Sequence, residues 1–177
     1  MKSNIVKVDN HGKGIEELMT EISKVAVYKE IDKADAAKLQ LLGEEMVSLI
    51  SGLDGDVKAN VWIECKDHNC DMTLTTRTVL DKEERYRLIS SSTSGKNEIT
   101  KTFLGRVRNA LEEALASEVD HDYFLVPHEL AADLPQGPED DPNWDGAERK
   151  VMRAIADSVK ITIRNRRVKM VVSKKFA

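Results

Sequence analysis

The spacing of apolar residues changes abruptly between residues 52 and 57, and this change constrains the fold more than any other feature. Before it, apolar residues recur every three or four positions over residues 14–30 and 33–52, as in amphipathic helices. After it, every second residue over residues 57–65 is apolar or small, and alternation resumes over residues 72–78 beyond a polar turn at 66–69. This pattern predicts two helices followed by an antiparallel hairpin with one buried face.

The remaining elements follow from the same two periods. Residues 81–89 and 96–117 have helical spacing, and Asp81 with Glu84 resembles a capping box, as does Asp145 with Glu148. Residues 159–163 and 168–172 alternate about a turn at Asn165, which predicts a second hairpin. Two separated hairpins with helices between them predict an α+β fold. We expect a two-layer sandwich in which helices cover one face of a mixed or antiparallel sheet, as a single domain over residues 1–177.

Charge is unevenly distributed near the C-terminal end. All four prolines lie between Pro127 and Pro142, and residues 129–145 are acidic without a single base. This composition predicts a long irregular loop at about 120–145. Residues 149–175 are rich in Lys and Arg, with Asp157 as the only acid. Such asymmetry is typical either of a nucleic-acid surface or of an acidic loop lying on a basic sheet. The net charge of −4 favours the second.

The composition also bears on location. No apolar stretch approaches the roughly 20 residues that a membrane-spanning helix needs, and the first residues show no signal-peptide pattern. Cys65 and Cys70 are too few for a disulfide framework. We therefore expect a cytoplasmic protein without membrane contact, whose two cysteines are reduced.

Three segments carry a family resemblance. They are residues 41–50, with Glu44 four positions before Ser48, the hairpin 57–80, and the ending from Asp145–Gly146 to Met170, Lys174 and Phe176. Together they resemble the ATP-binding domain of bacterial anti-sigma serine kinases and histidine kinases, the GHKL or Bergerat fold. The resemblance implies ATP and magnesium as cofactors, Glu44 as the residue that positions a base or water, and Ser48 at the place of the family's magnesium-binding Asn.

The sequence departs from this family where the nucleotide binds. The family's Asp-x-Gly-x-Gly, which follows the central strands and holds adenine, is replaced by the charged residues 81–85. Bulky side chains cannot give the close backbone approach that those glycines allow. The second glycine motif is reduced to Gly146. The resemblance thus implies the fold more strongly than ATP binding or kinase chemistry.

Two further groups of residues have the composition of ligand sites. Gly95 and Lys96 follow a serine-rich stretch at the expected start of a helix, where backbone N–H groups attract phosphate, although Ser94 as a plain N-cap explains the pattern as well. Cys65, His68 and Cys70 have zinc-ligand chemistry but no fourth ligand. The alternative is that both cysteines are small apolar residues facing each other across the hairpin, and we predict no metal site.

Three functions remain open at this stage. The leading hypothesis is a degenerate anti-sigma-kinase-like regulator that binds a protein partner, with nucleotide binding weak or lost. The second is an active ATP-dependent serine kinase that uses Glu44 and Ser48. The third is a small nucleic-acid-binding regulator that uses the basic C-terminal hairpin, which the overall charge disfavours. The sequence leaves open whether the chain forms a homodimer.

Overall fold

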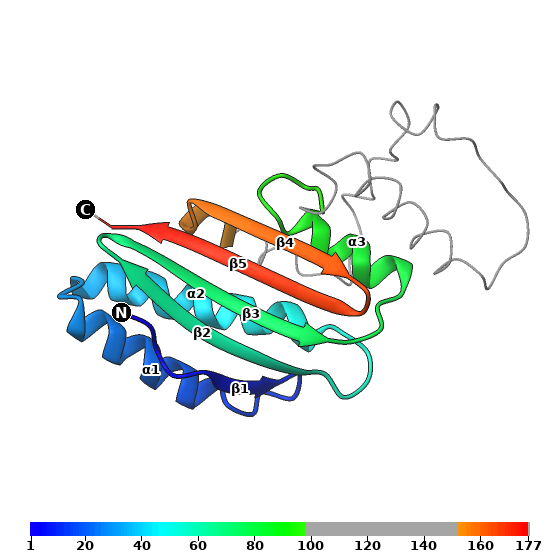
Figure 1. Cartoon of the computed structure of the whole chain (residues 1–177), viewed down its shortest axis with the longest axis horizontal. Coiled ribbons are helices and arrows are strands. Elements are labelled where there is room, and N and C mark those ends of the chain that lie inside the picture. Colours follow the sequence, from blue (N-terminus) through cyan, green and yellow to red (C-terminus); the bar gives the residue numbers. More distant parts are fainter. Residues whose placement is uncertain (98–151, 177) are drawn as a thin grey trace, which may run out of the picture.

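The computed structural model describes residues 1–97 and 152–176. These residues form an α+β structure in which one sheet is backed by helices (Figure 1). In chain order the elements are β1 (Val6–Asp9), α1 (Ile15–Tyr28), α2 (Lys33–Ser51), β2 (Lys58–Lys66), β3 (Asn69–Arg77), α3 (Lys82–Ser90), β4 (Ser158–Arg164) and β5 (Arg167–Lys175).

The five strands lie in the order β1-β2-β3-β5-β4, and every neighbouring pair is antiparallel. Both predicted hairpins are present, and they adjoin because β3 pairs with β5 along its whole length, from Asn69 opposite Lys175 to Arg77 opposite Arg167. The predicted α+β sandwich is confirmed, and the described sheet is entirely antiparallel rather than mixed.

One face of the sheet packs against α1 and α2, which Figure 1 shows behind the strands. Alternate strand residues are buried on the helix-covered side of the sheet, including Ile63, Leu74, Ile161 and Met170. The opposite strand residues, such as Lys58, Arg77 and Lys169, are exposed. The alternation read from the sequence is therefore the division between the core and an open face.

Helices α1 and α2 match the predicted ranges within a few residues, and Asp32 is the N-cap of α2. The Asp32 side chain accepts a hydrogen bond from the Asp35 N–H at 2.9 Å. Gly43 lets the two helices approach closely, because a Cβ there would lie 2.6 Å from Cδ1 of Ile22. Both residues are buried, so the contact is part of the core.

The edge strand β1 was not predicted. It pairs with β2 through Val6 opposite Val61 and Val8 opposite Ala59. The chain then turns through Gly14, whose φ of 86° is left-handed. A Cβ on Gly14 would overlap the backbone carbonyl of Lys7, so glycine is needed where α1 leaves the strand.

Helix α3 starts with the predicted capping box, in which Asp81 and Glu84 each accept a hydrogen bond from the other's N–H. The predicted helix 96–117 is described only at its first two residues, which are not helical, so its expected start is too early. The rest of that helix, the loop at about 120–145 and the second capping box at Asp145 and Glu148 lie outside the described residues.

Candidate functional site

Helix α2 carries the two residues that the resemblance assigns to catalysis and magnesium binding. Glu44 is exposed, and its side chain makes no hydrogen bond or ion pair with any residue in the described ranges. Ser48 lies one helical turn later and is half-buried. The spacing puts both side chains on one side of α2. The neighbouring Glu45 is the more buried of the two glutamates, a difference that the sequence did not reveal.

The region directly after β3 holds a buried polar network instead of a glycine loop. Glu84 is only 3% exposed. Its Oε1 accepts a hydrogen bond from the Asp54 N–H at 2.7 Å, and its Oε2 accepts one from the Asp81 N–H at 2.9 Å. The carboxylate thereby joins the start of α3 to the loop that follows α2. These backbone donors are occupied within the protein and are not offered to a ligand.

The segment from Ser91 to Asn97, which holds the predicted phosphate contacts Gly95 and Lys96, covers the outer edge of β4. Thr93 donates its N–H to the carbonyl of Val159 at 2.8 Å and accepts the Val159 N–H on Oγ1 at 2.7 Å. Asn97 makes a matching pair of hydrogen bonds with Ile163. These hydrogen bonds satisfy backbone groups on the outer edge of β4, and this role explains the conformation of the segment.

Gly95 and Lys96 lie at the exposed tip of that segment. The Gly95 N–H donates to the carbonyl of Ser92 at 3.2 Å, and the Lys96 N–H donates to Oγ of Ser94 at 3.3 Å. Both backbone donors are therefore used inside the loop. Of the two residues, only the charged side chain of Lys96 is left to attract an anion. Gly146, the other predicted nucleotide contact, lies outside the described residues.

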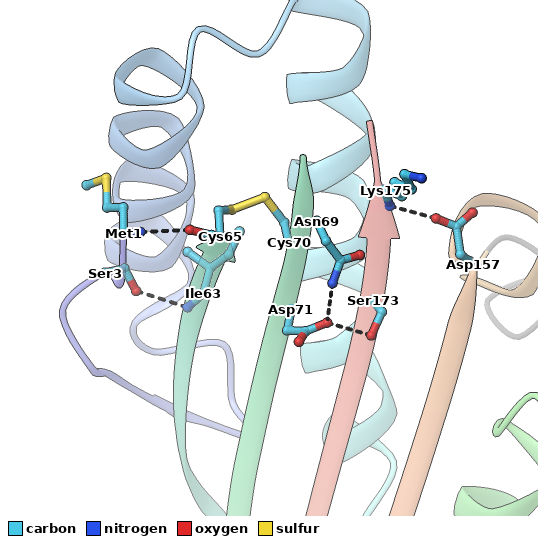
Figure 2. The surroundings of a disulfide bond; sticks show 10 residues. All are labelled: Met1, Ser3, Ile63, Cys65, Asn69, Cys70, Asp71, Asp157, Ser173 and Lys175. Carbon is cyan, nitrogen blue, oxygen red and sulfur yellow. Dashed lines mark hydrogen bonds between the residues drawn. A yellow bond between two sulfur atoms is a disulfide. The ribbon is translucent and has the colours of Figure 1, made fainter. Parts of the chain in front are cut away.

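Cys65 and Cys70 form a disulfide between β2 and β3 (Figure 2), which corrects the expectation of two reduced cysteines. They are directly opposite in register, with Cα atoms 4.1 Å apart. The backbone N–H and C=O of Cys65 pair with Met1 on the far side of β2, so the cysteines form a non-hydrogen-bonded pair. Side chains lie closest at such pairs, which explains the bond. The predicted facing of the two cysteines is confirmed.

The disulfide also bears on the zinc alternative. Both cysteines are buried, and disulfide sulfurs are not the thiolates that zinc binds. Within residues 1–97 and 152–176, no three His, Cys, Asp or Glu side chains are grouped so as to hold a metal ion. His68 is exposed in the hairpin turn.

A hollow of about 260 Å³ lies beside this hairpin turn. It is lined by Lys29, Glu30, Ile31, Asp32, Asp35, Asp67, His68, Cys70 and Phe176. Its acids make an unfavourable environment for phosphate, and Asp35 is already paired with Lys38 at 2.7 Å. The hollow includes none of the residues predicted to bind nucleotide.

The open face of the sheet is strongly patterned in charge. Arg77, Arg167 and Arg164 occupy adjacent positions on β3, β5 and β4 at one end of the sheet. Glu64 and Asp71 face each other on β2 and β3 at the other end. The basic residues recognised in the C-terminal sequence are thus joined by Arg77 from the first hairpin, a neighbour that only the strand pairing reveals.

The chain matches no protein-family model, and no curated protein matches it. Among the described residues, none of the helices combines the length and apolar character needed to cross a bilayer.

Proposed function

We propose that the chain is a degenerate anti-sigma-kinase-like regulatory domain that acts by binding a protein partner, with nucleotide binding weak or lost. The observation that carries this proposal is the capped helix α3, which begins five residues after β3 ends. The resembled family has its adenine-binding glycine loop after the central strands. Here the corresponding residues build a helix start held by Glu84.

The local chemistry supports the same proposal. A nucleotide site needs backbone donors that point toward the phosphates and glycines that let the nucleotide approach. In the described part of the chain, the N–H groups of Asp81, Glu84, Gly95 and Lys96 are all donated to protein acceptors. A domain whose backbone donors are used internally and whose open sheet face is charged is better suited to binding a protein than a nucleotide.

An ATP-dependent serine kinase is the second candidate. It is favoured by one observation, the placement of Glu44 and Ser48 one turn apart on α2. In that reaction Glu44 would act as the base toward a serine hydroxyl, and Ser48 would supply a neutral oxygen ligand to magnesium.

Thermal unfolding with and without magnesium and ATP separates the two candidates. A ligand present at 100 times its Kd stabilises the folded state by about 2.7 kcal/mol, which is visible as a raised Tm. We expect no such rise with millimolar ATP. A clear rise that Glu44→Ala or Ser48→Ala abolishes would reject the degenerate domain and favour the kinase.

The proposal includes a cytoplasmic location, which we expected from the composition of the sequence. A reducing compartment would keep Cys65 and Cys70 as thiols, because disulfides rarely persist there. Rapid alkylation of thiols in intact cells, followed by mass analysis of the chain, tests this part of the proposal. Two alkylated cysteines would support a reducing compartment, whereas an intact disulfide, as the structure has it, would place the protein in an oxidising one.

A further inference from the structure

The basic end of the open face consists of a row of three arginines. Arg77, Arg167 and Arg164 are directly opposite one another across β3, β5 and β4, and all three are exposed. Lys169 lies two residues along β5 on the same face. None of the ion pairs recorded among the described residues involves these four side chains.

Such a row is unfavourable in the isolated protein. Like charges directly opposite each other on neighbouring strands destabilise a sheet. An acidic group placed over the row would relieve this repulsion and gain charge-assisted hydrogen bonds from the guanidinium groups. The row is therefore better matched to a bound acidic surface than to water alone.

The middle of the open face is less polar. Trp62 and Val171 lie in one cross-strand row on either side of Thr73, and both are half-buried. Lys2 lies over the Trp62 ring, with Nζ 5.1 Å from the ring centroid. An apolar centre with a charged rim, enriched in Trp and Arg, is the usual composition of a protein–protein interface.

The far end of the face carries charges of both signs. Lys66 and Lys175 flank Asn69 in the last cross-strand row, and two acids lie in the row before it. Glu64 and Asp71 are opposite each other, and Asp71 also accepts a hydrogen bond from Oγ of Ser173 at 2.6 Å (Figure 2). The face therefore runs from the arginine row through a weakly apolar middle to an end of mixed charge. A nucleic acid is negative along its whole length and is opposed by Glu64 and Asp71, whereas a protein can present both signs. Trp62 is the single aromatic residue on the open face of the described strands, which gives little stacking surface.

A second copy of the chain fits the face less well. Besides the arginine row and Lys169, the described strands carry five more lysines on this face, namely Lys7, Lys58, Lys66, Lys160 and Lys175. The acids on this face are Asp9, Glu64 and Asp71. Asp9 is already engaged, because its Oδ1 accepts the N–H groups of His11 and Lys13. Two such faces would bring more bases than acids together.

We propose that the open sheet face is the docking surface for a protein partner that presents acidic side chains to Arg77, Arg167 and Arg164. Apolar residues of the partner would pack over Trp62 and Val171. This inference rests on the proposed function, since it names the surface and the partner chemistry through which a protein-binding regulator acts. Exposed charge pairs of this kind weaken as salt rises.

The test uses the full chain and a helical peptide with glutamates along one flank and leucines beside them. We expect binding that salt weakens, with backbone NMR shifts confined to the open face of β2, β3, β5 and β4. The variant Arg77→Glu/Arg164→Glu/Arg167→Glu should raise Kd by about tenfold or more. The matched control Lys13→Glu/Lys33→Glu/Lys82→Glu makes the same change in net charge at exposed positions off this face and should leave Kd nearly unchanged.

Four outcomes would reject the docking surface. The first two are no binding of the peptide at millimolar concentration and an equal loss of affinity in both triple variants. The other two are tighter binding of an oligonucleotide of equal charge and a dimer in sedimentation that the arginine variant dissociates. Circular dichroism and urea unfolding of both variants exclude a failure to fold. The ATP measurement described above is independent of these results, so failure of the proposed function and failure of this surface are distinguishable.

Discussion

Asn97 pairs with Ile163 in the way that a neighbouring strand would. Its Nδ2 donates to the Ile163 carbonyl at 3.0 Å, and the Ile163 N–H donates to Oδ1 at 3.2 Å. Asn97 is only 3% exposed, so a single carboxamide replaces water at the outer edge of β4. Together with Thr93 it protects an edge that would otherwise be open to pairing with another chain.

Replacing Asn97 with Ala should therefore be costly. The change leaves the N–H and C=O of Ile163 without these partners in a buried position, and each unsatisfied group costs about 1–3 kcal/mol. We expect Asn97→Ala to lower the free energy of unfolding by about 2 kcal/mol or more. Urea unfolding followed by circular dichroism measures the loss.

Lys96→Ala is the matched control, since Lys96 is adjacent and exposed. It should change stability by no more than about 0.5 kcal/mol. Equal effects of the two substitutions would show that the loop as a whole, and not the Asn97 carboxamide, secures the edge of β4.

Two glycines with nearly the same φ allow steric overlap to be separated from backbone strain. Gly14 has φ of 86° and Gly55 has φ of 80°. A Cβ at Gly14 would overlap the Lys7 carbonyl, whereas a Cβ at Gly55 meets no atom within 4 Å. We expect Gly55→Ala to cost about 1 kcal/mol through its left-handed backbone alone. Gly14→Ala should cost several kcal/mol, because β1 or α1 must also shift.

Urea unfolding of both variants and the wild type measures this difference. NMR shifts of β1 residues should change in Gly14→Ala and stay constant in Gly55→Ala. Equal losses of stability would mean that β1 and α1 shift apart without further cost. The close approach at Gly14 would then not stabilise their packing.

Hydrophobic period allowed most of the fold to be predicted, because six elements are long enough to repeat it. Helices α1 and α2 and the two hairpins bury one face each, and their residues alternate accordingly. Strand β1 has four residues and two buried valines, Val6 and Val8, which is too short a pattern to separate from a loop. Its position depends on pairing with β2, a contact distant in sequence.

The candidate sites were less predictable for the same reason. Sequence spacing places Glu44 and Ser48 one turn apart but cannot say that Glu44 is exposed. The Gly95–Lys96 pair has the composition of an anion loop, yet Asn97 beside it sets the loop against β4. The disulfide depended on register, because a shift of one residue would turn Cys70 to the other face of the sheet.

The disulfide between Cys65 and Cys70 should stabilise the oxidised protein modestly. It closes a loop with a sequence separation of 5. For so short a loop, the chain-entropy model gives about 2 kcal/mol. We expect a reductant to lower the urea midpoint of the wild type and to leave Cys65→Ala/Cys70→Ala unaffected. Thiol titration of the unfolded, air-oxidised protein should find no free thiol before reduction. A midpoint that ignores the reductant after both thiols have appeared would contradict this stabilisation.

The last prediction concerns the carboxylate of Asp157 at the start of β4. The Lys175 N–H donates to its Oδ2 at 2.6 Å, and Nζ of Lys174 lies 3.2 Å from its Oδ1. The backbone hydrogen bond from Lys175, more than the Lys174 charge, lowers the pKa of Asp157 below its ordinary value of 3.8.

A carboxyl group with a lowered pKa in the folded state stabilises the protein above its ordinary pKa, and this stabilisation is lost as pH falls through the folded value. Asp157→Asn should therefore be less stable than the wild type at neutral pH, by about 1 kcal/mol at most, because the group is exposed. Urea unfolding across pH should show this difference shrinking below 3.8. Lys174→Met removes the ion pair, keeps most of the apolar stem of this largely buried side chain, and should have the smaller effect. A difference that stays constant down to acidic pH would show that the charge of Asp157 does not stabilise the junction with β5.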